Sequence, residues 1–175
     1  MAKLDGDQIQ KIARGEIETA QILDINEDQM AAVLLAGYFF YENGKLPVAQ
    51  EIFEGLLILD TGNPFVHAML GSIYQKQEQF QLAFRHYSRA IQSFPQDIGS
   101  LINRGEIFLR FGKFKEAADD FKAAIDLDPE QQNPSASRAR LLSRLAQESL
   151  QVARDKGLQA ALDEQNQLKN DLRTE

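Results

Sequence analysis

The chain contains no cysteine and only two histidines, His67 and His86. The absence of cysteine excludes disulfides, thiolate nucleophiles and zinc or iron–sulfur sites with cysteine ligands. The two histidines lie 19 residues apart, far from the H-x-x-x-H and H-E-x-x-H spacings that place two imidazoles on one metal ion. We therefore expect neither a metal site nor any other cofactor.

The chain also lacks an excess of basic residues and long apolar runs. Its 19 Lys and Arg residues face 26 Asp and Glu residues, which gives a net charge of −7. Nucleic-acid binding is disfavoured because phosphate neutralisation needs clustered Lys and Arg. No run approaches the roughly 20 apolar residues of a membrane span, and the first residues carry no apolar stretch typical of a secretory signal. The expected location is the cytoplasm, without membrane attachment.

Catalytic motifs are missing or incomplete. No phosphate-binding glycine loop and no G-x-S-x-G nucleophile motif occurs. Residues 60–62 spell Asp-Thr-Gly, as in aspartic proteases, but occur once and in a predicted turn. Asp126, Asp128 and Glu130 alternate as in part of a calcium loop, yet the required glycine and terminal glutamate are absent, so an acidic helix end is the better interpretation. We expect a protein that is not an enzyme.

A repeat of 34 residues dominates what is present. The segments 30–63, 64–97 and 98–131 align without gaps. Small, aromatic and proline residues recur in register, at Gly37, Gly71 and Gly105, at Phe40, Tyr74 and Phe108, at Ala49, Ala83 and Ala117, at Phe53, Tyr87 and Phe121, and at Pro95 and Pro129. This period and these columns resemble the tetratricopeptide repeat (TPR).

The resemblance implies an all-α fold, a TPR helical solenoid of three antiparallel helix pairs. Their expected ranges are 30–43 with 46–59, 64–77 with 80–93, and 98–111 with 114–127. Because a mid-helix glycine costs about 0.5–1 kcal/mol relative to alanine, three in register indicate close helix approach, with the alanines of the second helix accepting the bulk of the aromatics. Gly44 and Gly112 are expected to adopt the left-handed conformation in the turns, where the middle repeat has Glu78.

The flanking segments complete this solenoid. Residues 1–29 are predicted to form an N-terminal helical segment, with a capping box between Asn26 and Gln29. Residues 132–156 are predicted to form a capping helix, which covers the last apolar face of a repeat stack. Residues 157–175 form a polar tail, either helical or frayed.

The first helix of each pair lines the concave side of a TPR stack, so the residues opposite its packing columns form the candidate peptide-binding groove. Apolar residues on a face that the stack cannot bury indicate a protein or peptide partner. Alternatively, the residues of the first repeat pack under the N-terminal segment or form a dimer contact. His67 occupies a column that usually holds a large apolar residue and is expected to be packed. The predicted groove residues are Leu34, Tyr38, Tyr41, Phe65, Ala68, Ser72, Gln75, Ile102, Glu106, Leu109 and Arg110.

Two TPR subfamilies can be compared with this groove. Adaptors for chaperone tails clamp a carboxylate with Lys, Asn and Arg, but the matching columns here hold Leu34, Tyr38, Gly99 and Asn103, so a clamp is disfavoured. Residues 34–60, including the ending Leu59-Asp60, and residues 71–91 resemble the class II chaperones of type III secretion. That resemblance implies a cytoplasmic chaperone holding an extended segment of a secreted translocator, and a homodimer through the N-terminal segment and first repeat. A TPR adaptor or scaffold in another bacterial assembly or regulatory pathway stays the alternative.

Overall fold

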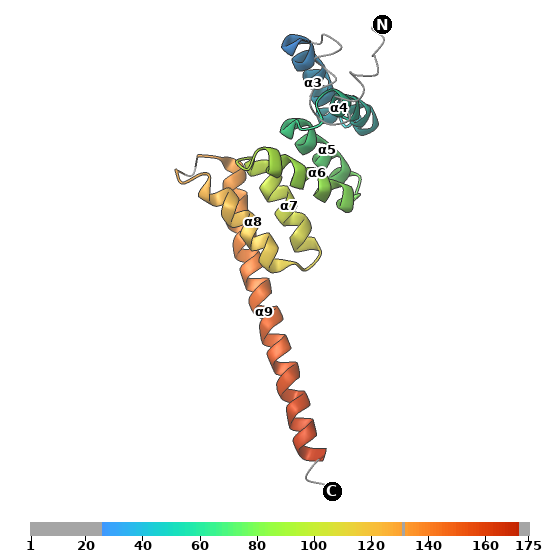
Figure 1. The fold of residues 1–175 in the computed structure, drawn as a ribbon. Coiled ribbons are helices and arrows are strands. Elements are labelled where there is room, and N and C mark those ends of the chain that lie inside the picture. Colours follow the sequence, from blue (N-terminus) through green and yellow to red (C-terminus); the bar gives the residue numbers. More distant parts are fainter. Residues whose placement is uncertain (1–25, 131, 172–175) are drawn as a thin grey trace, which may run out of the picture. The chain divides into compact units, whose positions relative to one another are not determined.

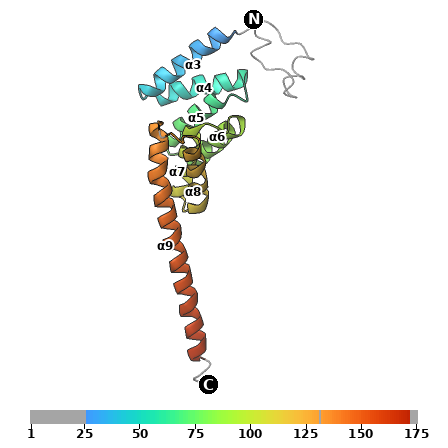
Figure 2. The same ribbon diagram turned by 90° about the vertical axis from the view of Figure 1, so that its left-hand side faces the viewer.

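Residues 26–130 and 132–171 are described in a computed structural model, and within them the secondary structure is entirely α-helical. This confirms the predicted all-α fold, with helices packed in pairs (Figures 1 and 2). The helices are α3 (Glu27–Glu42), α4 (Leu46–Leu59), α5 (Pro64–Lys76), α6 (Phe80–Ser93), α7 (Ile98–Arg110), α8 (Phe114–Asp126) and α9 (Pro134–Asp171). The predicted N-terminal segment lies outside the described residues, apart from its last residues at the start of α3.

Local sequence signals set the helix ends. Asn26 and Gln29 form the predicted capping box at α3, with Gln29 N donating to Asn26 Oδ1 at 2.9 Å and Asn26 N donating to Gln29 Oε1 at 3.0 Å. This box starts α3 at Glu27, three residues earlier than the repeat boundary suggests. Pro64 opens α5 as expected, and the Asn63 side chain accepts a hydrogen bond from Val66 N at 3.1 Å.

The turn inside each helix pair requires a left-handed residue. Gly44 and Gly112 have φ angles of +71° and +70°, as predicted. Glu78 adopts the same conformation with φ of 59°. A side chain is disfavoured there because Cβ crowds the following carbonyl oxygen. The middle turn therefore carries local strain that its two counterparts avoid.

The chain divides into two compact units, Met1–Arg104 and Gly105–Glu175, which are described separately. In the first unit, α3 packs on α4, α4 on α5 and α5 on α6. Phe53 and Tyr87 are fully buried where they face the glycines of the preceding helix. A Cβ built on Gly37 would lie 2.9 Å from Phe53 Cζ, and one on Gly71 would lie 2.6 Å from Tyr87 Cε1. The glycines therefore accommodate these two rings directly, and Ala49 and Ala83 of the second helices are fully buried as well.

In the second unit, α8 packs against α9. Gly105 repeats the same arrangement, since its Cβ would lie 2.6 Å from Cε1 of the buried Phe121. The first part of α9 buries Ala136, Ala139 and Ala146. The boundary predicted at 156/157 falls inside α9, a single helix of 38 residues that continues well past α8 (Figures 1 and 2). No helix within the described ranges is long and apolar enough to cross a membrane.

Candidate functional site

The first unit contains an open apolar hollow of about 620 Å³, lined by Ala31, Leu34, Leu35, Tyr38 and Phe65. This volume falls within the roughly 300–1,000 Å³ of typical ligand sites. The four residues from α3 follow the i, i+3, i+4, i+7 pattern, which places them on one helical face. Phe65 comes from the first turn of α5. The structure thus brings together three predicted groove residues, Leu34, Tyr38 and Phe65.

These lining side chains remain accessible to solvent. Leu35 is 69% exposed, Tyr38 43% and Phe65 45%. Phe65 is nevertheless held in place, because its ring contacts the buried Phe53 edge to face, with ring centroids 6.4 Å apart. The hollow is therefore a preformed apolar surface, fixed by the core of the first helix pair.

Lys76 of α5 contacts an aromatic side chain of α3. Its Nζ lies 4.1 Å from the centroid of the Tyr41 ring, a cation–π contact between α3 and α5. Tyr41 is half-buried, and its ring centroid is 6.4 Å from that of Tyr38. Tyr41, another predicted groove residue, is not among the lining residues of the hollow, but it contacts Tyr38 and contributes to holding α3 against α5.

The predicted groove residues Ser72 and Gln75 serve the interior of the second repeat instead. The Tyr87 hydroxyl donates to Gln75 Oε1 at 2.8 Å and lies 3.2 Å from Ser72 Oγ. Ser72 Oγ in turn donates to the carbonyl of Ala68 at 3.0 Å. The Tyr87 ring packs against Gly71 of α5, and its hydroxyl reaches Ser72 and Gln75 of the same helix. A buried phenol hydroxyl needs such hydrogen-bond partners. Repeats one and three have phenylalanine in this column and need none.

Of the remaining predicted groove residues, Ala68 is half-buried on α5 and the other four lie on α7. Ile102 is only 2% exposed, so its place on an open groove face was wrong. Its buried position follows from the close packing around α7, where Leu101 is buried as well. Glu106 forms an ion pair with Arg138 of α9 inside the second unit. Leu109 is half-buried and Arg110 is exposed, and both belong to the second unit.

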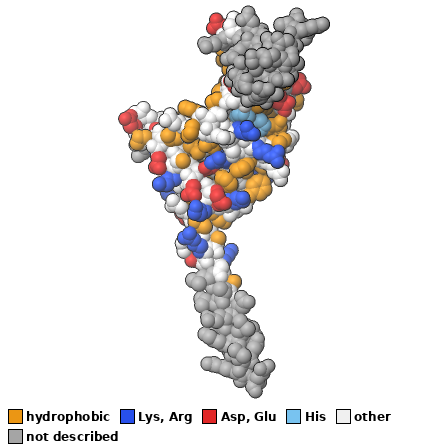
Figure 3. All heavy atoms as spheres, viewed as in Figure 1, with side chains coloured by type: hydrophobic (Ala, Val, Ile, Leu, Met, Phe, Trp, Pro, Cys, Tyr) orange, Lys and Arg blue, Asp and Glu red, His pale blue; other side chains and the backbone are white. Residues whose placement is uncertain are grey.

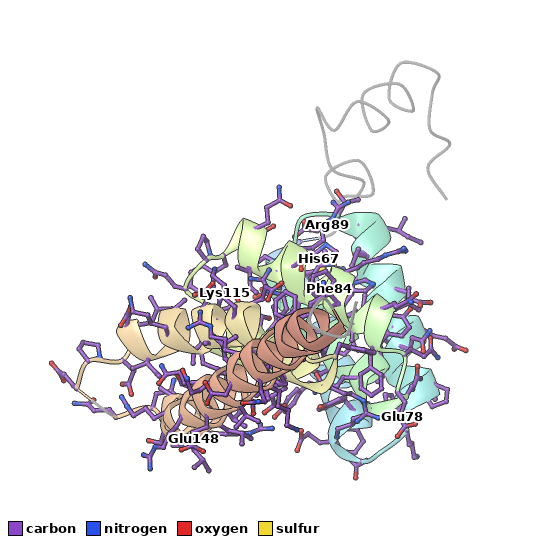
Figure 4. All side chains as sticks on the ribbon, turned by 90° about the horizontal axis from the view of Figure 1, so that it is seen from below. His67, Glu78, Phe84, Arg89, Lys115 and Glu148 are labelled. Carbon is purple, nitrogen blue, oxygen red and sulfur yellow. The ribbon has the colours of Figure 1, made fainter. Side chains whose placement is uncertain are left out.

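The two histidines form a contact that sequence spacing did not indicate. His67 is 5% exposed, which confirms that it is packed. Its Nδ1 lies 3.0 Å from Nδ1 of His86, and its Nε2 lies 3.1 Å from the carbonyl oxygen of Thr61. Figure 3 shows a histidine side chain reaching the surface of the first unit beside Lys and Arg side chains, and Figure 4 shows Arg89 on the same side as His67.

Burial lowers the pKa of both histidines. The pKa of His86 falls to about 4, through desolvation and the neighbouring His67, with Arg89 lowering it further and Glu54 opposing. The pKa of His67 is lowered by desolvation, against the opposing effect of the Thr61 carbonyl. Both rings are therefore neutral at pH 7.

Tyr74 extends this polar cluster to α4. Its ring stacks on His86 with centroids 5.3 Å apart, and its hydroxyl donates to Glu54 Oε1 at 2.7 Å. Burial and the adjacent Glu54 carboxylate raise the pKa of Tyr74 to about 12. The cluster joins three consecutive helices by hydrogen bonds and stacking. Across residues 26–130 and 132–171, no group of three or more potential ligands is arranged to hold a metal ion.

The incomplete motifs have structural roles at turns. Residues 60–62 connect α4 to α5, where Asp60 Oδ1 accepts a hydrogen bond from Gly62 N at 3.1 Å. Asp128 follows α8 and is 7% exposed. Its Oδ1 accepts hydrogen bonds from the backbone N–H groups of Gln132 and Asn133, and its Oδ2 lies 3.3 Å from Arg140 Nη2. These carboxylates therefore organise loops.

Ala31 and Leu35 line the hollow but are not among the predicted groove residues. Leu35 sits one position after Leu34 and, at 69%, is more exposed than Tyr38 and Phe65. The predicted groove positions were chosen by counting from Gly37, and this choice covered a narrower part of the α3 surface than the part that lines the hollow. The i, i+4 relation between Ala31 and Leu35 was the available signal.

Comparisons with known proteins place these features in context. A family model described as tetratricopeptide repeat matches residues 70–147. Hsp70-Hsp90 organizing protein 1 of Arabidopsis thaliana is 35% identical over 75 residues, 43% of this chain and 13% of that protein. DnaJ homolog subfamily C member 3 of Gallus gallus is 27% identical over 124 residues, 68% of this chain and 24% of that protein. The chain thus spans at most about a quarter of these relatives.

Solved structures resemble a larger share of the chain. A type III secretion system complex from Aeromonas hydrophila aligns with a TM-score of 0.75 at 23% identity, covering 83% of this chain and 98% of that chain. The translocator chaperone SycD of Yersinia enterocolitica aligns at 0.65 and 21% identity, covering 74% and 98%. PcrH, in complex with the chaperone binding region of PopD, aligns at 0.65 and 24% identity, covering 70% and 94%. At identities below 25%, these TM-scores show a shared fold alone.

Proposed function

Since the chain is a tetratricopeptide repeat protein whose structural neighbours are translocator chaperones, we propose that it is a non-enzymatic protein-binding module. Its function is that of a bacterial cytoplasmic chaperone. It holds an extended segment of a secreted, translocator-type client, and the apolar hollow of the first unit takes one of the client's side chains. The proposal depends on that hollow more than on any other feature.

The chemistry of the hollow favours an apolar side chain on an extended peptide. All five lining residues are aliphatic or aromatic, and Leu35, Tyr38 and Phe65 are exposed. Burying an apolar side chain against this surface contributes roughly 1.5–3 kcal/mol. Because Phe65 is fixed by Phe53, little side-chain entropy is lost on binding. A chaperone of this kind shields an apolar client segment from water until export.

The neighbouring structures support this assignment by analogy. PcrH is described in complex with the chaperone binding regions of PopD and PopB, and SycD in complex with a peptide of the translocator YopD. SycD is also described as a dimer. We propose that this chain can also form a homodimer, through the N-terminal segment and the first repeat. Phe39 on α3 is 60% exposed and would contribute to the contact between the two copies.

Co-expression with the translocator-type protein encoded nearest to this gene tests the proposal. Phe65→Glu should reduce co-purification of that client at least tenfold, because it places a charge in an apolar site. Ile58→Glu is a matched control, since Ile58 is 67% exposed on α4 and outside the hollow. Thermal unfolding of both variants checks the fold. Undiminished binding by a folded Phe65→Glu variant would reject the hollow as the site.

A TPR adaptor or scaffold in another bacterial pathway is the second candidate. The observation in its favour is the sequence similarity to Hsp70-Hsp90 organizing proteins. Against a carboxylate clamp stand Leu34 and Tyr38, which occupy clamp columns and line the apolar hollow instead. Failure of the native chain to bind the translocator in the same experiment would favour the adaptor.

A further inference from the structure

A stripe of apolar side chains runs along α9 on the side that α8 leaves uncovered. Leu141, Leu145 and Val152 are 65%, 48% and 52% exposed. At about 100° per residue, these three side chains fall within a sector of about 40°. The buried Ala139 and Ala146 lie on the opposite side of the helix, where α9 packs on α8. The packing of α8 on α9 therefore leaves the three apolar side chains of this stripe about half or more exposed.

Two charged residues continue the stripe at either end of the leucine pair. Arg138 precedes Leu141 by one turn, and Glu148 follows Leu145 by one turn. Figure 4 shows Glu148 on the side of α9 away from α8. Arg138 pairs with Glu106, but its side chain is still 59% exposed, so a second carboxylate can reach it. The order along this face is basic, apolar, apolar, acidic.

Two copies of this face are complementary when the two helices run in opposite directions. In an antiparallel pair of α9 helices centred at the level of residue 143, Leu141 of each copy faces Leu145 of the other. The same register sets Arg138 against Glu148, and the two-fold axis makes each contact occur twice. A parallel pair would instead set Glu148 against Glu148 and Arg138 against Arg138, and like charges in contact are unfavourable.

We propose that this face of α9 binds a second copy of the chain in the antiparallel orientation. The spacing of Arg138, Leu141, Leu145, Glu148 and Val152 alternates three and four residues, as in the a and d positions of a coiled coil. Because α8 packs on the opposite side of α9, the helices of the dimer form four layers, α8, α9, α9 and α8. This interface is separate from the hollow of the first unit and does not depend on the client proposed for it.

Association of the full chain tests this dimer. Sedimentation equilibrium of the native protein should show a monomer–dimer equilibrium, and Leu141→Glu should weaken it at least tenfold. Phe94→Glu, which places the same charge at a 48% exposed apolar position after α6, outside both α9 and the first repeat, should leave the dissociation constant within twofold. A native chain that stays monomeric at 100 μM or above, roughly the limit for weak specific pairs, would overturn the proposal. A dimer that persists in the Leu141→Glu variant would also overturn the proposal, because the interface of that dimer would lie elsewhere.

The absence of cysteine allows the orientation to be tested by cross-linking. An equimolar mixture of Arg138→Cys and Glu148→Cys chains should form a mixed disulfide on mild oxidation. Neither variant alone should cross-link efficiently, because equal positions of antiparallel helices in this register lie 10 residues, or about 15 Å, apart along the axis. Efficient cross-linking of either variant with itself would indicate parallel pairing and overturn the antiparallel arrangement. Lack of any mixed disulfide, with both chains folded, would overturn the interface.

Discussion

Nδ1 of His67 and Nδ1 of His86 lie 3.0 Å apart, and this contact fixes where both rings carry their protons. The carbonyl of Thr61 can only accept, so Nε2 of His67 is the protonated nitrogen at 3.1 Å. Nδ1 of His67 therefore accepts, and Nδ1 of His86 donates. If both rings carried a second proton, two N–H groups would face each other. The contact therefore holds only while at least one of the two histidines is neutral.

Acidification should therefore destabilise the first unit. The pKa of His86 is about 4 in the folded chain and near 6.5 in the unfolded chain, and that of His67 is also lowered. Below pH 6.5 the unfolded chain binds protons that the folded chain does not, so the free energy of unfolding falls as the pH drops from 6.5 towards 4. Arg89 facing both rings reinforces this, while Glu54 and Asp60 oppose it.

Urea unfolding at pH 7.5 and pH 5.0 measures this effect. Because His86 is only half-buried, solvent screens part of the cost, and we expect the histidine contribution to the loss to be about 1 kcal/mol. In His86→Gln the difference between the two pH values should be smaller by a similar amount. Equal pH differences in the native chain and the variant would show that His86 does not titrate as described.

Gly71→Ala should destabilise the protein by about 1–3 kcal/mol, the usual cost of overpacking. The added Cβ would lie 2.6 Å from a ring carbon of Tyr87, which is 1% exposed and has no room to retreat. Gly55→Ala is the matched control, because Gly55 lies inside α4 with no atom within 4 Å of the new Cβ. It should stabilise the protein by about 0.5–1 kcal/mol through helix propensity. Chemical denaturation of both variants should give shifts of opposite sign.

Glu78→Gly should stabilise the chain by about 0.5–1 kcal/mol. The φ of 59° costs a residue with a side chain about 1–2 kcal/mol, of which glycine recovers most after its own entropy cost. Gly112→Ala makes the reciprocal change at φ of +70° and should destabilise by a similar amount. The midpoint of thermal unfolding measures both. A lower midpoint for Glu78→Gly would mean that the Glu78 side chain contributes more than its backbone costs.

Asp128→Ala should destabilise the second unit by about 2 kcal/mol. The substitution removes the carboxylate that accepts from two loop N–H groups and pairs with Arg140, so these part-buried donors lose that partner. Asp126→Ala, two residues earlier, loses only an exposed pair with Lys122 at 3.8 Å and should change stability by less than about 0.5 kcal/mol. Equal effects in denaturant titrations would show that Asp128 has no special role in the loop.

Much of the fold is determined by the sequence alone. The repeated columns, the glycines of two turns, Pro64 and the capping box at Asn26 all specify local structure, because backbone conformation and helix periodicity depend on neighbours in the chain. The repeat pattern also placed Leu34, Tyr38 and Phe65 on one predicted groove face, and in the structure these three side chains line the same hollow.

Only the tertiary structure decided what the other groove candidates do. Ser72 and Gln75 bind the hydroxyl of Tyr87, which lies on another helix, and Ile102 is buried. His67 and His86 meet although 19 residues separate them. A helical pattern tells which face of its own helix a side chain occupies, but burial and hydrogen bonding depend on what neighbouring helices place opposite that face. Those contacts between helices form only when the helices pack.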